Sequence, residues 1–177
     1  SDEEDVEREL KRVKDEVDKI NEDVRRELRK SEEDVERWDE DLERVVRRVE
    51  EEVRKTGIDE ELKRKADERL EEAKKRVEDS HRRLREEHRR IEKDLRDSTR
   101  EIEKLLRDIR KRLTDTGDKK VLEKLKKDLR DALKRHRDRV EKLKEENRKL
   151  NEDHKKTLED IKEELKRLLD ELKETRR

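Results

Sequence analysis

The fold of this chain is decided by residues 6–53, which read VERELKRVKDEVDKINEDVRRELRKSEEDVERWDEDLERVVRRVEEEV. Apolar side chains recur along this stretch at steps of three and four residues. Positions eighteen residues apart carry matching apolar side chains, as Leu10, Leu28 and Val46 do. Because eighteen residues make five turns at about 3.6 residues per turn, the apolar stripe runs straight along one helix face. The stretch predicts one long amphipathic helix.

Two short interruptions divide the chain into three such helices. Residues 56–59 (TGID) and 116–118 (TGD) each place a glycine where a left-handed helix end is favoured and an aspartate where the next helix begins. The eighteen-residue rows recur in the two stretches that follow. We therefore expect helices at about 2–55, 60–115 and 119–175.

These helices determine the predicted architecture. Ser1 and Glu4 have the spacing of a capping box at the start of the first helix. Each helix would be roughly 80 Å long, and the short loops make consecutive helices antiparallel. The sequence predicts an all-α fold with a single domain over residues 1–177. That domain would be an elongated, up-down-up antiparallel three-helix bundle, nearly untwisted.

The composition fits a bundle and excludes several functions. The chain is 65% charged and 24% hydrophobic, with a net charge of -1 and no Cys, Pro, Met, Phe or Tyr. Such narrow apolar seams suffice for three helices closing on one another but not for a globular enzyme core. The balanced charge gives no long-range attraction to nucleic acid or anionic lipid, and no apolar run exceeds two residues. We expect no enzyme activity, cofactor, membrane or nucleic-acid partner. We also expect a soluble chain without a natural localisation, cytoplasmic on recombinant expression.

Polar residues interrupt the apolar seams at three levels. Folding the chain at its loops brings together positions whose numbers sum to about 115 in the first two helices and about 235 in the last two. The predicted layers are Ser31 with His88 and Asn147; Trp38 with Ser80, His81 and His154; and Ser98 with Thr99 and His136, with Asn21 nearby. A buried histidine or indole N–H needs a hydrogen-bond partner. The sequence predicts three buried hydrogen-bond layers that fix helix register.

Other functions of these polar layers have weaker support in the sequence. A metal centre needs three or four ligands in one layer. Each layer offers one histidine, or two where His81 takes part, and no carboxylate on the seam. Ser31 and His88 could meet, but the pattern contains no oxyanion donors and no orienting acid. We therefore expect no metal or catalytic residues. Sensitivity to acid remains open, because a neutral buried histidine resists protonation.

The chain resembles de novo designed helical bundles, and more narrowly parametrically generated straight three-helix bundles that carry designed buried hydrogen-bond networks. The features that carry the resemblance are the eighteen-residue rows, the Ser/His/Asn layers, the glycine in each loop and the surfaces of Glu, Lys and Arg. One departure is a first helix unusually rich in Val, which forms helices less readily than Leu. The resemblance implies a hyperstable structural scaffold with no natural substrate.

An interaction module is the alternative to a closed monomeric scaffold. In such modules buried polar networks encode which helices pair, either in a homo-oligomer or with a separate helical partner. Apolar pairs widen the stripe at 45–46, 105–106, 121–122 and 168–169. An exposed strip of Val45, Leu105 and Leu168 would favour association. We expect a monomer instead, because these pairs lie near the helix ends, where extra packing offsets fraying.

Overall fold

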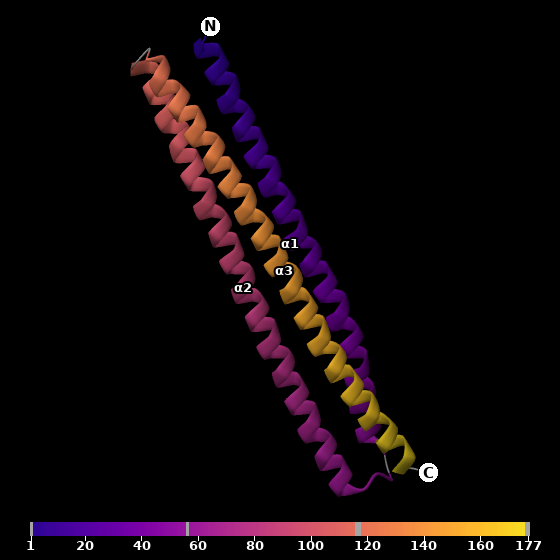
Figure 1. Cartoon of the computed structure of the whole chain (residues 1–177). Helices are drawn as coiled ribbons and strands as arrows, with labels where there is room; N and C mark the ends of the chain where they lie inside the picture. Colours follow the sequence, from indigo (N-terminus) through magenta and orange to yellow (C-terminus); the bar gives the residue numbers. More distant parts are fainter. Residues whose placement is uncertain (1, 56, 116–117, 176–177) are drawn as a thin grey trace. The chain divides into compact units, whose positions relative to one another are not determined.

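The chain consists of three α-helices in a computed structural model that describes residues 2–55, 57–115 and 118–175. The helices are α1 (Asp2–Arg54), α2 (Glu60–Asp115) and α3 (Lys119–Thr175), coloured from indigo through magenta to yellow in Figure 1. Within the described ranges there is no strand. The predicted all-α class and three-helix bundle are confirmed, and the predicted helix bounds differ from the observed ones by a single residue at the end of α1.

The first loop ends α1 in the predicted way. Gly57 has a φ of 89°, in the left-handed region that favours glycine, and Ile58 packs against the core formed by the adjoining helix ends. The Asp59 carbonyl accepts the Lys63 N–H at 3.0 Å, which is the first helical bond of α2. The Asp59 backbone therefore starts α2 directly after the glycine turn.

The second loop shows the cap that begins α3. Asp118 Oδ1 accepts the Lys120 N–H at 3.0 Å, and the Asp118 carbonyl accepts the Leu122 N–H at 3.2 Å. The Asp118 carboxylate therefore caps α3 by accepting from the Lys120 N–H, a first-turn donor that has no partner within the helix. Four residues named by the sequence predictions lie outside the described ranges: Ser1 of the capping box, Thr56, Thr116 and Gly117.

Contacts divide the chain into two compact units, each with one segment from every helix. Unit 1 comprises Ser1–Leu28 and His88–Asn147, and unit 2 comprises Arg29–Glu87 and Arg148–Arg177. The single domain over residues 1–177 stays a prediction. Each unit is described below on its own.

The core of unit 1 is formed by apolar side chains of all three helices. Its buried members are Val6, Leu10, Val13 and Val17 of α1, Ile102, Leu106 and Ile109 of α2, and Leu129, Ala132 and Leu133 of α3. Polar partners on α2 and α3 follow in opposite order, Arg90 with Glu146 and Ser98 with His136, so these segments are antiparallel. Burial of each large side chain contributes about 1.5–3 kcal/mol.

The core of unit 2 is built in the same way from the other helix segments. Its buried members are Leu42, Val45, Val46, Val49 and Val53 of α1, Ala66, Leu70 and Ala73 of α2, and Leu158, Ile161, Leu165, Leu168, Leu169 and Leu172 of α3. Arg69 pairs with Glu171 and Arg76 with Glu164, again in opposite order along α2 and α3. These segments of unit 2 are therefore antiparallel as well.

The apolar strip considered for self-association is not exposed. Val45 is 4% exposed and Leu168 is fully buried, both within the core of unit 2. Leu105 is half-buried and packs against the core of unit 1. Among the described residues no large hydrophobic side chain is exposed. The additional apolar residues widen the stripe within each unit, so the suggestion of an exposed strip is wrong.

Candidate functional site

The polar network of unit 1 is centred on His136, which is 1% exposed. Its Nε2 lies 2.9 Å from Asn21 Oδ1 of α1, and its Nδ1 lies 2.7 Å from Ser98 Oγ of α2. Asn21 Nδ2 donates to Thr99 Oγ1 at 2.9 Å, and the Thr99 hydroxyl donates to the Leu95 carbonyl at 2.8 Å. The network joins all three helices of unit 1.

These bonds assign the proton of the imidazole. The Thr99 hydroxyl uses its only hydrogen on a carbonyl, so it must accept from the Asn21 amide nitrogen. The Asn21 oxygen therefore faces His136 and needs a donor, which makes Nε2 the protonated nitrogen. Ser98 then donates to Nδ1. Burial lowers the pKa of His136 below its usual 6.5, which favours this neutral form.

Unit 2 contains a second cluster around His154, which is 3% exposed. His154 Nδ1 lies 2.6 Å from Ser80 Oγ, and its Nε2 lies 3.8 Å from Oδ1 of Asp39. His81 Nε2 approaches Asp39 Oδ2 to 2.7 Å, and the two imidazole centroids are 5.1 Å apart. The three helices of unit 2 thus bring two imidazoles and one carboxylate together.

The electrostatics of this cluster centre on Asp39. Burial by itself would raise the pKa of the Asp39 carboxyl. The polar and electrostatic interactions of Asp39 with His154 and His81 act in the opposite direction and lower that pKa below its usual 3.8. Asp39 is therefore an anion at neutral pH, held between two imidazoles.

The two networks occupy equivalent places in the eighteen-residue rows. The equivalent pairs are Asn21 and Asp39 on α1, Ser98 and Ser80 on α2, Thr99 and His81 on α2, and His136 and His154 on α3. The serines and the central histidines are the same in both networks. The amide of unit 1 is replaced by a carboxylate in unit 2, and the threonine is replaced by a histidine.

Asp39 is the functional side chain that sequence reasoning missed, because only carboxylates on the seam were considered and Asp39 reaches the layer from beside it. Asp39 flanks the seam instead of lying on it, and its side chain is 30% exposed. The residue numbers of Asn21 and Thr99, and of Asp39 and His81, sum to 120 instead of the expected 115. This offset of about one and a half helical turns places Asp39 beside His81. Asp39 lies eighteen residues after Asn21, and this spacing in the sequence is the feature from which its role could have been predicted.

Trp38 takes a different role from the predicted one. Its ring is half-buried against the core of unit 2, and Lys155 Nζ lies 5.7 Å from the ring centroid. Within the part of the chain that the structure describes, the indole N–H makes no hydrogen bond with the His154 cluster. Trp38 packs against the core of unit 2, and the expectation that its N–H joins the layer is wrong.

The predicted layer of Ser31, His88 and Asn147 is divided between the two units. Ser31 belongs to unit 2 and is 4% exposed. His88 and Asn147 belong to unit 1, where Asn147 is buried and His88 half-buried. Each of the three residues has an interaction partner within the chain. Their assembly into one layer stays a prediction.

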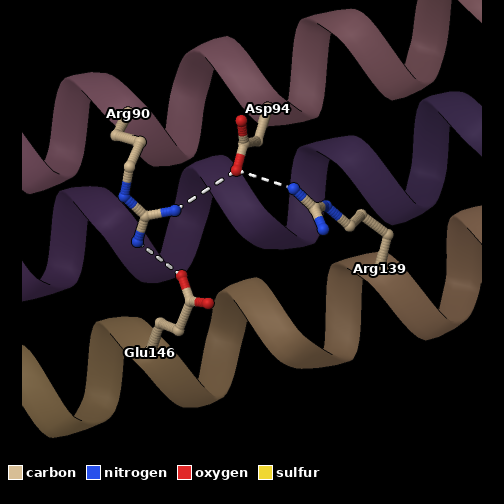
Figure 2. A network of polar contacts seen from close by, with 4 residues as sticks. All are labelled: Arg90, Asp94, Arg139 and Glu146. Atoms are coloured by element: carbon tan, nitrogen blue, oxygen red, sulfur yellow. Dashed lines mark hydrogen bonds and ion pairs between the residues drawn. The ribbon is translucent and has the colours of Figure 1, made fainter.

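Ion pairs link α2 and α3 on the surface of unit 1. Figure 2 shows Asp94 between Arg90 and Arg139, with Arg90 also reaching Glu146. The Asp94 carboxylate lies 3.2 Å from Arg90 and 2.9 Å from Arg139, and Arg90 lies 2.6 Å from Glu146. These side chains are 22–50% exposed, so each pair contributes at most about 1 kcal/mol. Glu16 of α1 pairs with Arg137 of α3 in the same unit.

Comparison with known protein families, curated protein sequences and solved structures found no match to this chain. In the described ranges no helix is both long and apolar enough to cross a membrane.

Proposed function

We propose that the chain is a soluble, de novo designed structural scaffold without a natural biochemical activity, in which buried polar networks fix the register of the helices. The observation that supports this most strongly is the His136 network. It joins three helices through bonds that are all consistent with one tautomer of the imidazole. An alternative register would have to satisfy the same donors and acceptors.

The apolar seams alone would not select a register strongly. Their residues are similar from turn to turn, so a slip of seven residues would again bring apolar side chains together. Such a slip would move His136 away from Asn21 and Ser98 and leave buried polar groups without partners. Each such group costs about 1–3 kcal/mol. The networks would therefore act against misaligned states more than they add to overall stability.

Cysteine cross-linking tests this proposal, because the native chain has no cysteine. Arg90 contacts Glu146, so a cysteine pair at these two positions reports the native register of unit 1. A pair at Arg90 and Arg139 reports α3 displaced by seven residues. Both pairs are made with His136 and with His136→Leu, and disulfide formation is timed in each of the four proteins.

With His136 present, we expect the native pair to close and the displaced pair to remain largely reduced. With His136→Leu, we expect the chain to remain helical while the displaced pair closes at least about tenfold faster, equivalent to about 1.4 kcal/mol of register preference. Equal rates for the displaced pair in both backgrounds would reject a register-fixing role. Circular dichroism of each protein separates that result from unfolding.

A further inference from the structure

The Asp39, His81 and His154 cluster of unit 2 has the composition of a metal centre. Each residue offers one ligand atom, and these atoms lie within 4.8 Å of one another. They come from three different helices, so packing of unit 2 holds them together. Imidazole nitrogen combined with carboxylate oxygen suits Zn²⁺ and its first-row neighbours, whereas Mg²⁺ and Ca²⁺ prefer oxygen ligands alone.

Independent evidence comes from buried polar atoms that make no hydrogen bond. His154 is 97% buried, and its Nε2 faces the Asp39 carboxylate without a hydrogen-bond partner. Asp39 Oδ1 and His81 Nε2 are also buried without one, although His81 Nε2 lies only 2.7 Å from Oδ2. In the equivalent network of unit 1, His136 Nε2 is bonded to Asn21. A cation bound among these three residues would provide a partner for the buried atoms that make no hydrogen bond within the protein.

Ser80 contacts the His154 ring at Nδ1, the nitrogen that does not face Asp39. Its Oγ lies 2.6 Å from His154 Nδ1, so it can accept a proton held on that nitrogen. His154 Nε2 then presents a lone pair towards Asp39 Oδ1, which is the form a metal ion binds. An outer hydrogen bond of this kind orients metal-binding histidines in many proteins.

We propose that Asp39, His81 and His154 bind one divalent first-row transition-metal ion, with Zn²⁺ as its simplest representative. Ligand bonds of about 2.0–2.1 Å at tetrahedral angles separate neighbouring ligand atoms by about 3.3 Å. The distances from Asp39 to the two imidazoles are 2.7 and 3.8 Å, on either side of that value. The three ligand atoms lie within 4.8 Å of one another, so side-chain adjustments would bring them to an ion between them, and water would complete its coordination.

Cobalt provides the first measurement. The full chain, purified without a histidine tag and stripped with a chelator, is titrated with Co²⁺, whose visible absorption reports four-coordinate binding. Trp38 precedes Asp39 and is the only aromatic residue, so its fluorescence reports quenching beside the cluster. We expect saturable quenching and absorption at one Co²⁺ per chain, both reversed by Zn²⁺, and a matching stoichiometry for Zn²⁺ by calorimetry.

The substitutions that test the site are taken from the equivalent network of unit 1. Asp39→Asn with His81→Thr converts the cluster to the side chains found at Asn21 and Thr99, which this fold already accommodates. We expect this double variant to bind Zn²⁺ at least about 100-fold more weakly, since losing a direct ligand costs more than losing an outer partner. Asp39→Asn alone, nearly isosteric, provides a second test.

Asp34→Asn is the matched control, because Asp34 lies on the same helix and pairs with Arg37 outside the cluster. This control should bind like the native chain. Unchanged affinity in both Asp39 variants would overturn the proposal, as would a native chain with no saturable signal up to millimolar metal. Circular dichroism establishes that each variant is folded before its affinity is compared.

Discussion

His136 and His154 lie eighteen residues apart on α3, and each holds a serine hydroxyl against Nδ1, Ser98 at 2.7 Å and Ser80 at 2.6 Å. The two rings differ in what faces Nε2. Asn21 accepts a hydrogen bond from His136, whereas Asp39 lies 3.8 Å from His154. The same Ser–His pair therefore occurs in two settings. In unit 1 both ring nitrogens of the histidine are hydrogen-bonded, whereas in unit 2 His154 Nε2 has no hydrogen-bond partner.

Acid should destabilise the chain through His136. Burial lowers its pKa in the folded state below 6.5, while the unfolded chain binds a proton near about 6.5. The unfolded state thus binds more protons as pH falls below that value, and stability is lost there. We expect a lower urea midpoint at about pH 5.5 than at about pH 7.5. Asp39 contributes at a lower pH. Its pKa in the folded state lies below the usual value of about 3.8, so its carboxylate stabilises the fold above that pH and loses this contribution as the pH falls below it.

His136→Leu is the control for this pH dependence. The variant has no imidazole to protonate in the core of unit 1, so the difference between its two urea midpoints should shrink. Far-ultraviolet circular dichroism follows unfolding in both proteins. An equally large difference in the variant would assign the acid sensitivity to other groups.

Asn21→Ala should be more damaging than its size suggests. It removes the acceptor of His136 Nε2 and the donor to Thr99, leaving one buried donor unsatisfied. We expect a loss of about 1–3 kcal/mol in the free energy of unfolding, measured with urea. Asn21→Leu combined with His136→Leu removes both partners and should recover much of that loss. A double variant less stable than Asn21→Ala would show that the network contributes stability and not only specificity.

The helices and their seams could be predicted because they depend on local features. Apolar spacing sets the buried face, and Gly57 and Asp118 mark where helices end and begin. Ser98, Thr99 and His136 were brought to one level by counting residues from the loops. That count works because both helices rise by the same distance per residue.

The position of Asp39 could not be obtained in this way. It depends on how far α1 is offset along α2, which the apolar seam does not fix. Glu52 is a second example, since its side chain is 4% exposed and pairs with Lys55 at 3.1 Å near the end of α1. Apolar spacing assigns both carboxylates to the surface. Only packing of the helices shows that they are partly or wholly buried.

The first loop should need glycine at position 57 because of its backbone conformation, and not because a larger side chain would be crowded there. Its φ is 89°, yet a Cβ built at this position meets nothing within 4 Å. Gly57→Ala should therefore lower the free energy of unfolding by about 1–2 kcal/mol, the cost of a left-handed conformation for an ordinary residue. Gly57→Asn should lose less, because Asn tolerates this conformation better. Urea unfolding of the two variants measures the difference, and equal losses would point to crowding instead.

The chain should remain a monomer as its concentration rises. Val45 and Leu168 are buried in the core of unit 2, and none of the large hydrophobic side chains that the structure describes is exposed. Among the described residues, association would therefore find no exposed patch of large apolar side chains to bury, and exposed charged pairs are weak. Light scattering on a size-exclusion column at two concentrations should give a constant mass near 22.0 kDa. A mass that rises towards two chains would favour the interaction-module alternative, in which the seams meet between subunits and the polar networks select the partner.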